Sequence, residues 1–208
     1  MEYFLILALA LFLLTSASDR TTSVAPKATE LSPPARVQNV QTAQTPQMEN
    51  SSNGSWAYEQ VDAGKLRAFI RKFQPKYQEY QVDTMANTVI KNGKLYDLDP
   101  KLIAALIARE SGFDPKVTSS TGAMGLGQIK SFHFTRLGIT NPYDVEQGTK
   151  GVSIMLRELL NKWSQNPKPL NMALAEYKEG ASALSDKTYK PETQKYIEEI
   201  LKLRSELM

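Results

Sequence analysis

The chain has 208 residues, of which 41% are apolar and 23% charged, enough for one medium-sized domain with a core. It contains no cysteine and one histidine, His133. Disulfides, thiol nucleophiles and Cys-ligated metals are therefore excluded, and a His-rich zinc site or a Ser-His-Asp triad is disfavoured. The formal net charge of +3 is too small to indicate nucleic-acid binding. Carboxylates remain the favoured source of chemistry.

The N-terminal segment has the pattern of a targeting sequence. Residues 4–14, FLILALALFLL, form an unbroken apolar run followed by the small residues of TSAS, as in a signal peptide. A membrane-spanning helix needs about 20 apolar residues, which disfavours a stable anchor. Glu2 stands where a basic residue is usual, so cleavage stays open. We expect residues 1–18 to be a signal peptide or short anchor, and the protein to be exported to the periplasm or cell envelope.

Residues 19–55 differ from the rest of the chain in composition. They are rich in Ser, Thr, Gln and Pro and contain no aromatic residue. Such a segment cannot bury enough apolar surface to offset its chain entropy. We expect a disordered linker there and a folded domain over residues 56–208.

Between Lys65 and Leu207 apolar residues recur at helical spacing, separated by Gly, Pro, Asn and Asp. The segment 82–90 predicts a helix face that Gly93 terminates. Asp99 followed by Pro100 predicts a capped helix start, and Gly112 its end. Further helices are predicted from Asp144 through Trp163, over MALAEYKEG and over PETQKYIEEILKLRSEL. No stretch alternates convincingly with a period of two, which predicts an all-α domain of six or seven helices.

Glu110 ends the apolar run KLIAALIAR. At 100° per residue it lies about 80° from Leu102, in the middle of the stripe that also holds Leu106, Ile103 and Ile107. It therefore faces inward, in the last helical turn, where the helix dipole disfavours negative charge. Burial and dipole both raise the pKa, as a general acid requires. The alternative is that the stripe ends one turn earlier and Glu110 lies in solvent.

The segment GAMGLGQI places three glycines within six positions. Glycines let the backbone approach a neighbour or ligand closely, and Gln128 offers both a donor and an acceptor to a sugar hydroxyl or acetamide. A turn with no functional role is the alternative.

Several separated motifs together carry a family resemblance. In chain order they are ESGFDP, Ser119, GAMGLGQI, NPYDVEQGTKGVSIMLREL, ALAEYKEG and PETQKYI. In order and spacing they resemble the catalytic domain of soluble lytic transglycosylases (SLT type), a lysozyme-like fold that cleaves peptidoglycan. The likeness runs from about residue 66 to 201 and implies a lysozyme-like multi-helix domain.

The resemblance also implies site residues. Glu110 matches the catalytic acid, and Ser119 the serine that hydrogen-bonds near it. Gln128 and Tyr177 match a glycan-binding glutamine and a tyrosine beside the acid, and Glu192 an acid that lines the cleft. From the residues alone, Tyr177 could instead be a packed core tyrosine, and Glu192 could merely complement a helix N-terminus.

The chain departs from the family pattern in two places. AYNAG is replaced by EYKEG, which introduces Lys178 and two acids, and GLMQ by GLGQ followed by KSFHF. We expect the chemistry to be retained and the shape and charge of the cleft to differ. His133, within the altered segment, is expected to be exposed or half-packed.

The resemblance implies that Glu110 protonates the bond between N-acetylmuramic acid and N-acetylglucosamine, and that the muramic C6 hydroxyl then closes a 1,6-anhydro ring. It implies no metal or organic cofactor and peptidoglycan strands as the partner. We expect a monomer, and an envelope machinery is a second candidate partner. One alternative is a muramidase that uses water, with Asp114 or Asp144 as its second carboxylate. The other is a non-catalytic glycan-binding or scaffold domain.

Overall fold

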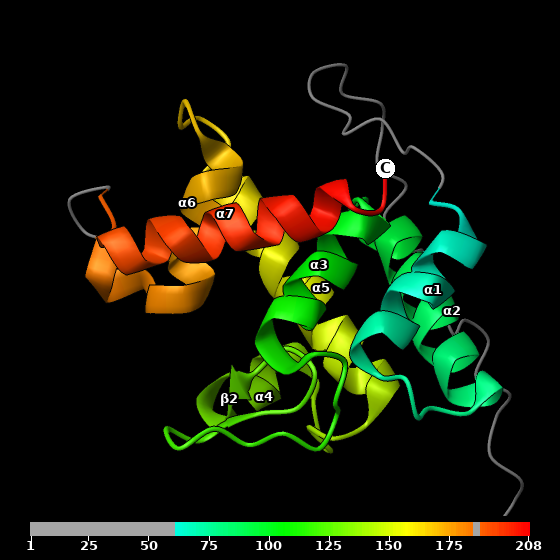
Figure 1. The fold of residues 1–208 in the computed structure, drawn as a ribbon. Coiled ribbons are helices and arrows are strands. Elements are labelled where there is room, and N and C mark those ends of the chain that lie inside the picture. The colour runs from blue at the N-terminus through cyan, green and yellow to red at the C-terminus, as the bar shows by residue number, and fades with distance from the viewer. Residues whose placement is uncertain (1–60, 185–187) are drawn as a thin grey trace, which may run out of the picture. The chain divides into compact units, whose positions relative to one another are not determined.

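The computed structural model describes residues 61–184 and 188–208. The expected signal segment, 1–18, and linker, 19–55, lie outside the described residues, as does the start of the expected domain at residue 56. The described part is mostly helical, as predicted (Figure 1). Its elements are α1 (Ala63–Phe73), α2 (Glu79–Leu95), α3 (Pro100–Ser111), β1 (Ala123–Met124), β2 (Ile129–Lys130), η1 (Ser131–His133), α4 (Phe134–Leu137), α5 (Val145–Lys162), α6 (Pro169–Glu179), η2 (Ala181–Leu184) and α7 (Pro191–Ser205).

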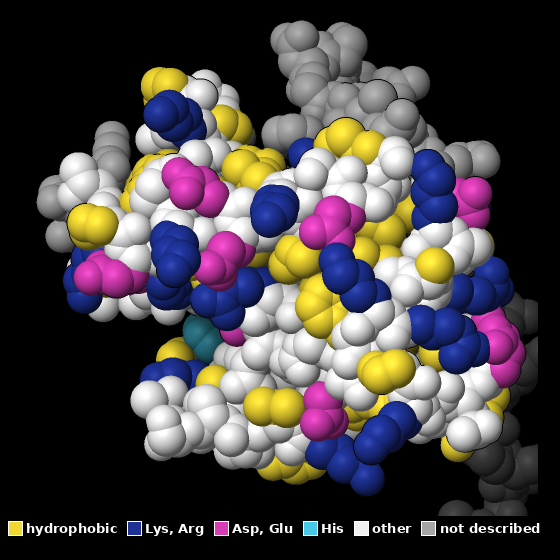
Figure 2. Space-filling model, in the orientation of Figure 1, with side chains coloured by type: hydrophobic (Ala, Val, Ile, Leu, Met, Phe, Trp, Pro, Cys, Tyr) yellow, Lys and Arg dark blue, Asp and Glu magenta, His cyan; other side chains and the backbone are white. Residues whose placement is uncertain are grey.

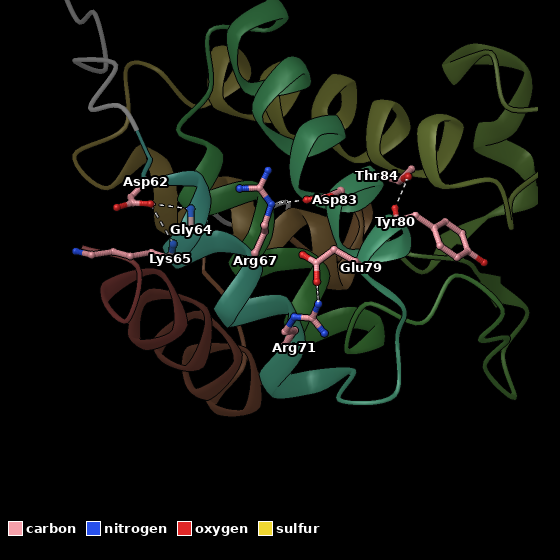
Figure 3. A network of polar contacts seen from close by, with 9 residues as sticks. All are labelled: Asp62, Gly64, Lys65, Arg67, Arg71, Glu79, Tyr80, Asp83 and Thr84. Atoms are coloured by element: carbon pink, nitrogen blue, oxygen red, sulfur yellow. Dashed lines mark hydrogen bonds and ion pairs between the residues drawn. The ribbon is translucent and has the colours of Figure 1, made fainter.

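Helices α1 and α2 pack side by side. Asp62 caps α1, since its side chain accepts from the backbone N–H groups of Gly64 and Lys65 at 2.7 and 3.2 Å. Across the pair, Arg67 meets Asp83 and Arg71 meets Glu79 in ion pairs (Figure 3). These pairs are partly exposed and add little stability. The buried apolar faces of the two helices contribute more.

Gly93 does not end α2, contrary to the sequence prediction. The helix continues to Leu95, and a Cβ at position 93 would lie 2.7 Å from the Pro100 side chain. The glycine therefore serves close packing between the end of α2 and the start of α3. Periodicity along one segment could not reveal this contact, because it depends on where the next helix lies.

Helix α3 is the central helix of the described domain. Asp99 caps it by accepting from Lys101 N at 2.9 Å, and Gly112 ends it in the left-handed region at φ 58°, both as predicted. All residues from Pro100 to Ala108 are buried, and α3 packs against α1, α2, α5 and α7. A helix covered on every side is apolar all round, which explains the run that precedes Glu110.

A loop with a short hairpin follows α3. Strands β1 and β2 pair antiparallel, Ala123 with Lys130 and Met124 with Ile129. Gly125 adopts φ 70°, and a Cβ there would lie 1.9 Å from the Pro142 carbonyl oxygen. The all-α prediction thus holds for the helices, and the structure adds this two-residue ladder. No helix within 61–184 or 188–208 has the length and apolar character that a membrane span requires.

Candidate active site

A cavity of about 480 Å³ opens between the helices and the hairpin loop. Helices α3, α6 and α7 supply one wall, here called the helical wall, and residues 119–133 supply the other, here called the loop wall. Figure 2 shows the surface hollowed between α7 and the β1–β2 loop, with Lys and Arg side chains on both sides. The lining includes Arg109, Glu110, Ser119, Gln128, Lys130, Phe132, His133, Tyr177, Lys178, Glu179 and Tyr196.

Glu110 lies in the last turn of α3 and lines this cavity. Its carboxylate accepts a hydrogen bond from the Tyr196 hydroxyl. Burial raises the pKa of Glu110, and the Tyr196 hydrogen bond and the charges of Arg109 and Lys178 oppose that rise. The net direction is upward, so the environment favours the protonated acid more than water does. The inward orientation expected from the helical repeat is therefore present.

Tyr196 is the central contact of Glu110. Two cations lie over its ring, the Arg109 guanidinium at 5.3 Å and the Lys178 ammonium at 5.1 Å from the centroid. Arg109 is held by Glu199 at 2.5 Å, and Lys178 donates to the Glu192 backbone carbonyl at 2.9 Å. Burial and the neighbouring Glu110 raise the pKa of Tyr196 well above its ordinary value. Tyr196 therefore remains a hydrogen-bond donor.

Tyr177 joins the two walls. Its hydroxyl donates to the Gly127 carbonyl at 2.8 Å, across from α6 to the hairpin loop. A Cβ on Gly127 would lie 2.2 Å from Val152 and 2.8 Å from the Tyr177 oxygen, so this position requires glycine. Burial raises the pKa of Tyr177 well above its ordinary value. Tyr177 thus lines the cavity and also packs internally.

Ser119 and Gln128 hold the loop wall in shape. The Ser119 hydroxyl oxygen accepts from Ala123 N at 2.9 Å and lies 3.2 Å from the Thr121 hydroxyl. The Gln128 amide nitrogen donates to the carbonyls of Val117 and Gly125 at 3.1 and 3.0 Å. Both side chains line the cavity. The Gln128 amide nitrogen and the Ser119 hydroxyl therefore make hydrogen bonds within the loop wall itself.

Glu192 is placed differently from the expectation. It is exposed at the start of α7 and is not among the described residues that line the cavity. Its contribution to the site is the backbone carbonyl that receives Lys178. A sequence position near a helix start does not determine whether the side chain lines a cavity.

The second carboxylates considered from sequence also lie elsewhere. Asp114 accepts from Lys116 N at 2.9 Å, and Asp144 caps α5 by accepting from Gln147 N at 2.8 Å. Among the described residues that line the cavity, the acids other than Glu110 are Glu176 and Glu179.

Both oxygens of Glu176 and one oxygen of Glu179 have internal partners, whereas Glu179 Oε2 is buried without one among the described residues. Both Glu176 oxygens lie 2.7 Å from Lys162 Nζ, and one also accepts from Trp163 Nε1 at 2.8 Å. Glu179 accepts from Lys190 N at 3.2 Å. Within 61–184 and 188–208, no three His, Asp or Glu side chains gather in a metal-binding arrangement. Glu110 is therefore the carboxyl that best combines access and a raised pKa.

Tyr196 is the main site residue that sequence reasoning missed. It lies in α7 on the buried stripe formed with Thr193, Ile197 and Ile200. A tyrosine on a buried stripe needs a partner for its hydroxyl. That signal was present in the sequence, but nothing in it indicated that the partner would be Glu110, 86 positions away.

Comparison with known proteins places this site in a family. Residues 87–200 match the family model of the Transglycosylase SLT domain, which is just over half of the chain and includes Glu110, the hairpin and Tyr196. The chain belongs to the Transglycosylase SLT domain family. The resemblance identified from the separated motifs is thereby confirmed.

Two curated relatives match parts of this SLT domain. The transglycosylase of Enterobacteria phage PRD1 is 39% identical over 87 residues, covering 42% of this chain and 31% of the relative. Membrane-bound lytic murein transglycosylase F of Shewanella oneidensis is 30% identical over 126 residues, covering 58% and 24%. The match thus spans about a third or less of each relative.

A solved structure of an inactive mutant of lytic transglycosylase Slt from Pseudomonas aeruginosa is also similar. It aligns with 20% identity and a TM-score of 0.45, covering 65% of this chain and 26% of that one.

Proposed function

We propose that the SLT domain is a peptidoglycan lytic transglycosylase of the cell envelope, and that Glu110 is its catalytic acid. The observation that carries the proposal is the Glu110 carboxyl, half-buried at the end of α3, bonded to Tyr196 and open to a cavity of about 480 Å³. The relatives named as murein transglycosylases support the same substrate. We expect the domain to act on glycan strands as a monomer.

In the first step Glu110 donates its proton to the oxygen that links N-acetylmuramic acid to N-acetylglucosamine. The raised pKa of Glu110 favours the protonated form that a general acid requires. As the proton leaves, the Tyr196 hydroxyl stabilises the resulting carboxylate. The acetamide of the muramic residue supports the developing positive charge at C1.

In the second step the Glu110 carboxylate takes the proton of the muramic C6 hydroxyl, whose oxygen attacks C1. The C1–O bond to N-acetylglucosamine is replaced by a C1–O6 bond, which gives a 1,6-anhydro product without consuming water. One protein carboxyl suffices, because the nucleophiles belong to the substrate. This fits a cavity in which both oxygens of Glu176 and one oxygen of Glu179 already have internal partners.

The remaining residues position the strand. Gln128 uses its amide nitrogen within the loop, so its oxygen is the atom that would accept from a sugar. Ser119 and Tyr177 fix the loop wall opposite Glu110. Their role is to hold the scissile bond within reach of the acid.

The proposal is tested on purified murein sacculi, with the released fragments analysed by mass spectrometry. We expect wild-type protein to release fragments lighter by one water than hydrolytic products, and Glu110→Gln to release none. Hydrated products would instead indicate the water-using muramidase. Sacculi that wild-type protein binds without cleaving would indicate the non-catalytic glycan-binding domain.

A further inference from the structure

Phe132 is an exposed aromatic side chain at the cavity. It lies in η1, between β2 and α4, and 73% of its surface is accessible. It lines the same cavity as Glu110. Water contact with so large an apolar ring is unfavourable. A folded chain that keeps the ring at a cavity rim therefore leaves it free for a ligand to cover.

The Phe132 ring is held in place by a series of contacts that runs through His133 and Arg136. The His133 imidazole packs against it at 4.2 Å between ring centroids and an interplanar angle of 47°. The Nδ1 of His133 lies 3.3 Å from Arg136, which forms an ion pair with Glu158 of α5. Burial and the Arg136 charge lower the pKa of His133. The lowered pKa favours the neutral imidazole, and the packed pair of rings presents a surface at the cavity.

We propose that Phe132, backed by His133, is a stacking platform for one pyranose ring of the glycan strand whose scissile bond lies at Glu110. This inference rests on the proposed function. A pyranose has a face of C–H groups that packs on an aromatic ring, while its hydroxyls stay at the edges in contact with water or polar groups. Lys130, exposed and lining the same cavity, is placed to meet such hydroxyls.

The surroundings of Phe132 favour a sugar over a protein partner. Protein interfaces need a contiguous apolar patch of several hundred Å². The residues beside Phe132 in the chain, Lys130 and Ser131, are polar and exposed. The other large exposed hydrophobics of the described residues do not line the cavity. A single aromatic ring bordered by polar groups matches the mixed character of a sugar.

Tyr80 provides a matched control. It is also an exposed aromatic, with 70% of its surface accessible, but it lies in α2 outside the cavity. Figure 3 shows its ring directed away from the polar network between α1 and α2. The Tyr80→Ala substitution therefore reduces the exposed aromatic area of the protein and leaves the proposed subsite unchanged.

The test measures binding of purified murein sacculi by co-sedimentation in the Glu110→Gln background, which separates binding from cleavage. We expect Phe132→Ala to weaken binding about tenfold, the scale of one aromatic stacking contact. Phe132→Tyr, which keeps the ring, should bind within about twofold of its parent. Tyr80→Ala should bind as the parent does.

Equal binding by the Phe132→Ala and Tyr80→Ala variants overturns the platform. So does equally weak binding by Phe132→Tyr and Phe132→Ala, or a change in self-association by sedimentation velocity without a change in sacculus binding. The proposed function fails on a different observation, namely the absence of fragments released by wild-type protein. Cleavage by wild type with unaltered Phe132→Ala binding therefore removes the platform alone. An absence of fragments from wild type removes the proposed function and, with it, the platform that rests on it.

Discussion

The two walls of the cavity are built on different principles. The helical wall places Glu110 and Tyr196 by burying the apolar faces of α3 and α7, and the two side chains meet as a consequence of that packing. The loop wall has few buried side chains. It is shaped instead by backbone hydrogen bonds, glycines and the side chains of Ser119 and Gln128. The acid thus lies on the wall that helix packing builds, and both walls carry a departure from the family pattern, EYKEG on α6 and KSFHF in the loop.

The largest expected effect comes from a substitution that displaces the backbone of the loop wall. Gly125→Ala places a Cβ 1.9 Å from the Pro142 carbonyl oxygen at φ 70°. We expect a loss of about 3 kcal/mol of unfolding free energy, because a fixed backbone atom must move. The matched control is Gly122→Ala at φ 79°, with nothing within 4 Å, which should cost about 1 kcal/mol. Urea unfolding measures both, and equal losses would contradict the close approach.

The next largest effect comes from removing one hydrogen bond in the helical wall while the fold is kept. Tyr196→Phe removes the hydroxyl that donates to Glu110. We expect kcat on sacculi to fall about 10- to 100-fold, because the acid loses its orientation. The hydroxyl also lowers the pKa of Glu110, so the basic limb of the pH–rate profile should move to higher pH. A basic limb that stays in place would show that the hydrogen bond is absent in solution.

Glu110 should also lower the stability of the fold at neutral pH. Burial raises the pKa of Glu110 in the folded state above the ordinary value of 4.5. The contribution of Glu110 to folding stability is therefore fully present below that ordinary value and is lost as pH rises through the raised folded pKa. Glu110→Gln cannot titrate. We expect the variant to match wild type near pH 4 and to exceed it by about 1 kcal/mol near pH 8. Thermal unfolding at both pH values measures this, and a constant difference would contradict it.

The smallest expected effect concerns the cation introduced by EYKEG. Lys178 lies over the Tyr196 ring and lowers the pKa of Glu110. Lys178→Met should move the basic limb of the pH–rate profile upward and reduce kcat about two- to fivefold. Lys178→Arg, which retains the charge, should leave the limb close to its wild-type position. Limbs that shift equally in both variants would indicate loss of packing rather than loss of charge.

The helices could be predicted from the sequence because their signals are local. Asp99, Pro100 and Gly112 bound α3 as expected, since caps depend on residues within one turn. The prediction that Gly93 ends α2 is wrong, because the role of this glycine depends on Pro100 of another element. The candidate site was predictable only where its residues depend on local signals. Glu110 faces inward through the repeat of its own helix, whereas the Tyr196 contact required a second helix to be placed.

By itself the sequence determined the helical class, the family and the inward acid, because periodicity, capping and motif spacing are properties of short stretches of chain. The tertiary structure decided what surrounds that acid. It placed Tyr196 against Glu110, left Glu192 exposed and outside the cavity lining, and left Phe132 exposed at the cavity. These are outcomes of packing between segments distant in the chain, where the direction of a side chain is set by its neighbours in space.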